Sequence, residues 1–252
     1  MLAVPRASAT QGPKEPQLPE FLTELWRGIT TPVAPPDDKI IWGTALAALV
    51  VVLAPGLWPR ARHLATVLHE GGHGIIALLT GRKLTGIRLH SDTSGLTTSR
   101  GKPRGLGMIL TLLAGYPAAT VAGIGGAFAL DHGLPLVVLW AMLAIFALML
   151  LKIRNFFGLW VILVLGVGIF ALNWWGAAEY QQIGAYLLTW FLLLAAPRPV
   201  LEMAQQRRGR AKTSDADQLG RLTWIPALGW VIVFLALTGG GLVWGFRLLA
   251  PL

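Results

Sequence analysis

The stretch of sequence that decides the fold is residues 63–81, HLATVLHEGGHGIIALLTG, an apolar segment interrupted by His69, Glu70 and His73. Its apolar flanks predict a helix, in which residues four positions apart lie on the same face. We therefore expect the imidazoles of His69 and His73 to point in one direction. That spacing lets two nitrogen atoms reach one tetrahedral ion at about 2.0–2.1 Å, the distance typical of zinc. The segment predicts a metal-binding helix in apolar surroundings.

The composition predicts a membrane as those surroundings. The chain has 252 residues, of which 54% are hydrophobic and 13% are charged, whereas soluble domains carry roughly a quarter charged residues. This excludes an ordinary soluble enzyme, a disordered protein and a nucleic-acid-binding module. The absence of Cys also excludes disulfides and thiolate zinc ligands.

Six further stretches have no charged side chain, and each approaches the roughly 20 residues that cross a bilayer. With 63–81 they predict an all-α polytopic membrane protein of about seven transmembrane helices. The six stretches are 41–58, 105–130, 134–151, 156–178, 180–196 and 222–246.

The remaining segments complete the predicted domain organisation. Residues 1–40 form a cytosolic N-terminal segment, in which 18–29 places its apolar side chains on one helical face. That pattern is typical of a helix lying on a membrane surface, and a packed cytosolic helix has the same pattern. Residues 41–250 form one membrane-embedded domain, whose basic stretch 197–224 is predicted to be a solvated cytosolic loop.

The positions of Lys and Arg predict the orientation in the membrane. Segments 1–40, 82–104, 152–154 and 197–221 hold 18 of the 21 basic residues. Because cytoplasmic segments are enriched in Lys and Arg, we expect a cytoplasmic N-terminus and, after seven spans, a C-terminus outside. The net charge of +9 is then a topology signal that also favours contact with anionic lipid. It does not indicate a nucleic-acid partner.

Glu70 is the only acidic residue that we place well inside a membrane helix. An ionisable side chain at that depth costs on the order of 2.5–3.5 kcal/mol even by translocon insertion, so its presence calls for a function. Zinc lowers the pKa of a bound water towards about 7. Glu70 is placed to take the proton of that water and to hand it later to the leaving amine of a peptide bond. Gly71, Gly72 and Gly74 leave the helix surface bare for a substrate backbone or a neighbouring helix.

At these residues the chain resembles the site-2-protease family of intramembrane zinc metalloproteases, in its compact bacterial branch of peptidase family B-like proteins. The resemblance is good over about 60–160 and thinner towards the C-terminus. It includes an extended segment after the zinc helix, its returning strand, and a Gly-Pro-containing helix in a tyrosine variant. The matching residues are Thr80–Leu89, Ser94–Thr98, Ala114–Ala118, Arg154–Gly158, Ser214–Asp217 and Leu222–Pro226.

The resemblance implies an enzyme of the bacterial cell (inner) membrane that hydrolyses peptide bonds in or near the transmembrane segments of other membrane proteins. It implies Zn²⁺ as the cofactor, His69 and His73 as metal ligands, and Glu70 as the catalytic residue. It also implies a small β-hairpin after the zinc helix. In bacteria such enzymes cleave signalling proteins, for example anti-sigma factors, in regulated intramembrane proteolysis.

The third metal ligand is the open question of the sequence. Family members usually take it from an Asp in a Pro-x-Asp-Gly or Leu-Asp-Gly motif, and this chain has neither. A catalytic zinc site normally has three protein ligands and a water. The candidates are Asn155, Asp92, Asp131 and Asp215, and of these we prefer Asn155, which lies where the family has an Asn-containing segment.

Three functions fit these patterns. The first is an active intramembrane zinc endopeptidase. The second is a non-catalytic protease-like membrane protein that binds partners or zinc without cleavage, which the missing third ligand favours and Glu70 disfavours. The third is a transporter in which Glu70, His69 and His73 relay protons. The absence of internal repeats and of other intramembrane acids counts against the transporter.

Overall fold

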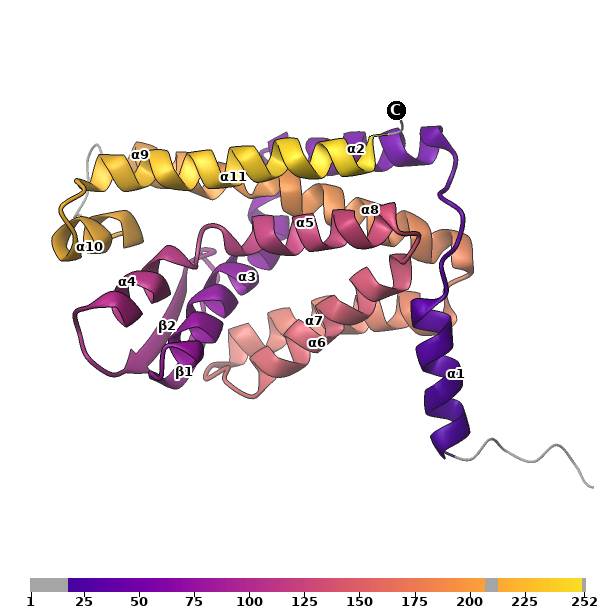
Figure 1. Cartoon of the computed structure of the whole chain (residues 1–252), viewed down its shortest axis with the longest axis horizontal. Coiled ribbons are helices and arrows are strands. Elements are labelled where there is room, and N and C mark those ends of the chain that lie inside the picture. The colour runs from indigo at the N-terminus through magenta and orange to yellow at the C-terminus, as the bar shows by residue number, and fades with distance from the viewer. Residues whose placement is uncertain (1–17, 207–212, 251–252) are drawn as a thin grey trace, which may run out of the picture.

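Eleven helices and one two-stranded antiparallel sheet make up the described parts of the chain, residues 18–206 and 213–250, in a computed structural model (Figure 1). The predicted helix over 18–29 is present as the first element. The elements are α1 (Leu18–Thr30), α2 (Asp38–Leu53), α3 (Trp58–Leu79), β1 (Lys83–Leu89), β2 (Gly95–Arg100), α4 (Leu106–Leu113), α5 (Ala118–Asp131), α6 (Pro135–Leu150), α7 (Phe156–Trp175), α8 (Ala178–Ala195), α9 (Pro197–Gln206), α10 (Asp215–Leu222) and α11 (Ala227–Leu249).

Hydrogen bonds between loops define the two ends of the bundle. At one end, the Val33 N–H donates to the carbonyl of Gly133 (2.8 Å), and the Gln182 side chain donates to the carbonyl of Ala34 (2.9 Å). The α1–α2 loop, the α5–α6 loop and the start of α8 therefore lie together. At the other end, the α6–α7 connection pairs with β1 through two bonds of 2.9 Å between Ile87 and the backbone of Lys152 and Arg154. We call the second of these the hairpin end.

The seven separate spans expected from the sequence are not confirmed. The expected spans 41–58 and 63–81 correspond to α2 and α3, which form a pair bent by 99°, and α4 and α5 form another pair bent by 64°. Among the described residues, three helices can span a membrane by length and composition, or five with each bent pair taken as one span. Helix α6 is a shorter apolar helix of 16 residues.

Helix α3 begins at Trp58, before the expected span 63–81, so Arg60 and Arg62 belong to it. Arg60 is exposed, and the guanidinium of the partly exposed Arg62 lies 3.3 Å from the Glu202 carboxylate of α9. The Trp58 indole N–H donates to the same carboxylate (2.7 Å). Glu202 therefore joins the start of α3 to α9.

The two ends of the described chain lie at one end of the bundle. Figure 1 shows α1 and the C-terminal end of α11 at the same end of the long axis, opposite the hairpin, α4 and α10.

The bundle packs through small residues. A Cβ at Gly123 or Gly245 would lie within 3 Å of the Leu193 side chain, and one at Gly126 would lie 2.7 Å from the Thr189 hydroxyl. Close approach of this kind is how helices associate where lipid removes the hydrophobic drive between them. It brings α5 and α11 against the buried helix α8, while apolar side chains along α7 such as Val167 and Trp175 face outwards.

The predicted hairpin is present, with β1 and β2 antiparallel and a register irregularity between Leu84 and Gly86. The inner face of β1 buries Ile87 and Leu89. On its other edge, β1 contacts the α6–α7 connection through a parallel bridge between Ile87 and Ile153. β1 is thus paired along both of its edges, with β2 on one and with the α6–α7 connection on the other.

The predicted solvated loop at 197–224 is wrong in its described part. Its residues form α9 and α10, whose side chains Val200, Met203 and Leu219 are buried against Phe234 of α11. The apolar positions are spaced at helical intervals between charges, and a charge count does not detect such an amphipathic helix. Residues 207–212 of this stretch lie outside the described residues.

The chain has no natural Cys, so single cysteines can test whether its two ends lie on the same side of a membrane. Thr31→Cys and Arg247→Cys, at the two chain ends, should react alike with a membrane-impermeant maleimide in intact cells. Lys83→Cys, at the hairpin end, should show the opposite accessibility. All three native residues are exposed, and the cysteine-free protein is the blank. Opposite labelling of Thr31→Cys and Arg247→Cys would show an odd number of passes.

Candidate metal centre

Helix α3 presents its two central histidines to one point. The Nε2 atoms of His69 and His73 lie 3.1 Å apart. His73 Nδ1 donates to the backbone carbonyl of Thr111 in α4, at 2.6 Å. Because a carbonyl only accepts, this bond puts the proton on Nδ1 and leaves the Nε2 lone pair free. A hydrogen bond of this kind, from the ring nitrogen that does not bind metal, orients a histidine that ligates a metal.

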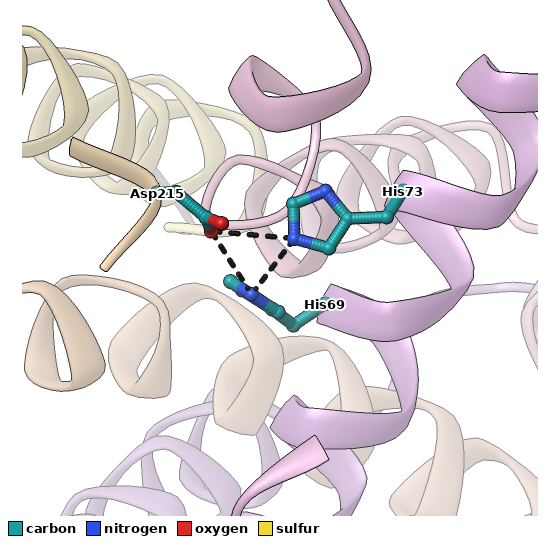
Figure 2. A group of neighbouring side chains, drawn as sticks. All are labelled: His69, His73 and Asp215. Atoms are coloured by element: carbon teal, nitrogen blue, oxygen red, sulfur yellow. Dashed lines mark hydrogen bonds and ion pairs between the residues drawn. The ribbon is translucent and has the colours of Figure 1, made fainter. Parts of the chain in front are cut away.

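Asp215 completes the group from the other side. Its Oδ2 atom lies 3.3 Å from His69 Nε2 and 3.2 Å from His73 Nε2. Figure 2 shows the two histidines coming from adjacent turns of one helix and the carboxylate facing them from α10. The three ligand atoms therefore form a nearly equilateral triangle.

A capping box holds Asp215 in place. The Ser214 hydroxyl caps α10 and accepts from the Asp217 N–H, while the Asp217 carboxylate accepts from the Ser214 N–H. Asp215 is thus in the first turn of α10, where the helix dipole stabilises a negative charge. Burial by itself would raise the pKa of the Asp215 carboxyl, but the facing His73 and His69 lower that pKa further, to below its usual range.

The geometry and chemistry of this group fit zinc. Ligands of a tetrahedral ion at about 2.0–2.1 Å lie about 3.3–3.4 Å apart, close to the three observed separations. Two imidazole nitrogens and one carboxylate oxygen form a set typical of catalytic zinc sites, in which the fourth position stays open. His69, His73 and Asp215 are therefore the residues that can hold the ion.

Glu70 lies beside this group and is held by the hairpin. Its side chain is 4% exposed. The Thr97 hydroxyl of β2 donates to Glu70 Oε2 at 2.6 Å, and a Cβ at Gly95 would collide with Oε1. Glu70 and His69 together line a cavity of about 170 Å³ that Gly95 and Tyr116 also border. A proton acceptor and a metal ligand thus face one small cavity.

The break between α4 and α5 forms the opposite wall. A Cβ at Gly115 would lie 2.5 Å from His73 Nε2 and 2.6 Å from His69 Cε1. The Tyr116 ring packs edge-on against His69, with centroids 4.7 Å apart. Gly72 of α3 packs against the same break. A Cβ at Gly72 would lie 2.6 Å from the Ala114 carbonyl oxygen, so a neighbouring segment of the chain explains this glycine.

Asn155, the preferred third ligand, is not brought to the histidines, and this expectation is corrected. Its amide donates to the Leu89 carbonyl (2.6 Å) and accepts from the Leu89 N–H (3.2 Å), so it extends the sheet. Asp92 accepts two hydrogen bonds from Ser94, and the bond from the Ser94 hydroxyl is the largest cause of the lowered pKa of the Asp92 carboxyl. Asp131 ends α5, at the end opposite the hairpin. Of the four candidates, Asp215 alone reaches the histidines.

Sequence reasoning also missed the positioning residues. Thr97 and Thr111 form hydrogen bonds with Glu70 and His73, respectively, although they lie far from them in the sequence. No local sequence pattern marks either threonine. Ser214 and Asp217 did carry a signal, because a Ser followed three residues later by an acid is a capping pattern. That pattern would have predicted a helix beginning at Asp215.

Comparison with known proteins agrees with this geometry. The sequence model of the Peptidase M50B-like family matches residues 42–245. The chain therefore belongs to this family of membrane peptidases, which confirms its resemblance to the site-2 proteases. The match includes both histidines, Glu70 and Asp215. No curated protein and no solved structure gives a significant match.

Replacement of Asp215 should separate the third ligand from its competitors. We expect Asp215→Ala to lose most of the roughly one zinc ion per chain that a three-ligand site binds. Asn155→Ala and Asp92→Ala should retain it, because neither side chain reaches the histidines. Metal analysis of detergent-purified protein measures this. Full zinc content in Asp215→Ala with loss in Asn155→Ala would restore the original expectation.

A methyl group at Gly115 should disturb the same site without removing a ligand. Gly115→Ala places a carbon against His73 Nε2, and we expect zinc affinity to fall by about 10–100-fold, the size of outer-shell effects. Gly125→Ala in α5 is the matched control, since its Cβ would meet no atom within 4 Å. Competition with a metallochromic chelator gives both affinities. Equal affinities would show that Gly115 is not needed for close approach.

Proposed function

We propose that this protein is an intramembrane zinc metalloendopeptidase that hydrolyses peptide bonds in or near the transmembrane segments of membrane proteins. The observation that carries the proposal is the meeting of Asp215 with His69 and His73 at separations of 3.1–3.3 Å. Family membership supports the peptidase class. The position of Glu70 on the same cavity as His69 supports hydrolysis over metal storage.

His69, His73 and Asp215 would hold the zinc ion. When bound, zinc supplies Lewis-acid polarisation and lowers the pKa of a coordinated water to about 7. The His73–Thr111 bond keeps the ring in the tautomer that can ligate. The capping box of α10 keeps the Asp215 carboxylate in place.

Glu70 moves the proton. It takes a proton from the attacking water and later gives it to the leaving amine nitrogen, as general acid–base catalysis requires. The Thr97 hydroxyl occupies Oε2, which leaves Oε1 for this transfer. Gly95 leaves room for Oε1, because the Cβ of any larger residue at this position would collide with that oxygen.

The size of the cavity limits the substrate. A cavity of about 170 Å³ is small beside an α-helix, whose diameter with side chains is about 10–12 Å. It favours a substrate that presents an extended, locally unwound segment. This favours cleavage near the end of a transmembrane helix or at a helix-breaking residue within it.

The hairpin end is proposed to face the cytoplasm of a bacterial inner membrane. The described basic residues concentrate there, which is typical of cytoplasmic segments. This reverses the expected side of the N-terminus and keeps the C-terminus outside. The basic residues at the hairpin end are Arg82, Lys83, Arg88, Arg100, Lys102, Arg104, Lys152, Arg154 and Arg221.

Glu70→Gln tests the proposed chemistry. The amide cannot accept the proton, so hydrolysis should fall by about 10²–10⁴-fold. Zinc content should stay unchanged because the three proposed ligands are intact. The assay reconstitutes the protein in liposomes with a library of bacterial single-pass transmembrane peptides and detects products by mass spectrometry.

The control is His69→Ala/His73→Ala, which should lose both zinc and cleavage. Cleavage by Glu70→Gln at the wild-type rate would contradict the assigned role of Glu70. A wild-type protein that binds zinc and cleaves no peptide would favour the non-catalytic alternative.

A further inference from the structure

Two cavities away from the metal centre meet at one residue. The first is an apolar groove of about 640 Å³ between α3 and the α4–α5 pair, and along α3 it reaches from Leu68 to Leu79. The second is a cavity of about 480 Å³ at the hairpin end, bordered by Arg82, Lys102 and Arg104. Thr80 lines both. The two cavities are therefore adjacent, one of them basic and the other apolar.

The basic cavity contains a buried cation without a counter-ion. Arg82 is 9% exposed, and its guanidinium donates to the Ser99 hydroxyl (3.0 Å) and the Lys102 carbonyl (2.6 Å). These bonds fix the group but leave its charge uncompensated. No acidic side chain of the described residues lies within ion-pair distance of Arg82, Lys102 or Arg104. Because an unpaired buried charge is costly, this cavity favours an anion.

The N-terminus of α4 also favours an anion in the basic cavity. Gly105 precedes the helix with a φ of 97° and provides no side-chain cap. The first turn of α4, including Leu106 and Gly107, lines the basic cavity. Uncapped N–H groups at a helix N-terminus bind anions such as phosphate.

The apolar groove indicates what carries the anion. Apart from Thr80, its lining side chains are apolar or absent, as at Gly71 and Gly72. Leu79 is 75% exposed and Leu106 is 70% exposed beside the two cavities. A free phosphate ion would leave this groove uncovered, whereas a hydrocarbon chain would cover it.

We propose that the two cavities form a binding site for an anionic phospholipid. The phosphate lies against Arg82, Lys102 and Arg104, and one acyl chain lies along the groove between α3 and the α4–α5 pair. Basic pockets between helices on the cytoplasmic side of a membrane are suited to such headgroups. The inference requires no proteolytic activity.

The test is native mass spectrometry of the full chain in mild detergent. Phosphatidylglycerol and phosphatidylcholine of equal chain length are titrated, together with glycerol 3-phosphate as the soluble source of the same anion. We expect phosphatidylglycerol to bind on the order of tenfold more tightly than phosphatidylcholine. Glycerol 3-phosphate should not displace it at equal concentration.

Two variants of equal charge change make the test specific. Lys102→Glu/Arg104→Glu should remove the preference for phosphatidylglycerol. Lys83→Glu/Arg88→Glu, also at the hairpin end but outside the cavity, should keep it. All four native side chains are exposed, so both variants should fold.

A third variant tests the groove. Ile75→Trp fills the apolar groove and should weaken phosphatidylglycerol binding without changing any charge. Equal binding of both lipids, an unchanged preference in Lys102→Glu/Arg104→Glu, or displacement by glycerol 3-phosphate would each overturn the proposal.

Discussion

The meeting of Asp215 with His69 and His73 is the contact on which the site depends. A buried carboxylate is costly when isolated, and here it faces two imidazole nitrogens at 3.2–3.3 Å. The contact joins α10 to the middle of α3, so it determines where the C-terminal third of the chain must lie. The amphipathic helices α9 and α10 bury Val200 and Leu219 around it, and this packing brings α10 back over the bundle.

Broken helices make that arrangement possible inside an apolar bundle. Irregular backbone at membrane depth is tolerated where protein covers it, and the break between α4 and α5 is covered by α3. Its Gly115 lets the backbone approach both histidines, and the Thr111 carbonyl just before it orients His73. The bend between α2 and α3 lets the metal-binding helix begin within the bundle, where Arg62 pairs with Glu202. Both helix breaks therefore contribute to the geometry of the candidate site as well as to the packing of the bundle.

Local sequence patterns predicted what lies within one element. The spacing of His69 and His73, the position of Glu70 and the apolar helices all follow from residues close together in the chain, whereas the hairpin was expected from the family resemblance. The seven-span count is not confirmed, because two of the expected spans fall on α2 and α3, which form one bent pair. Asn155 was preferred on its place in a family segment, but its amide is used by the Leu89 backbone.

By itself the sequence determined the helical membrane architecture and three residues of the candidate site, because helical periodicity and the cost of charge in lipid act locally. The family followed from the resemblance of its motifs. The candidate third ligand, the bending of α2 against α3 and the adjacency of a basic cavity and an apolar groove were decided only by tertiary structure. Each of these depends on which distant segments pack together, as Asp215 does with His69 and His73. Such pairings are set by packing across the whole bundle, and no spacing within a single helix encodes them.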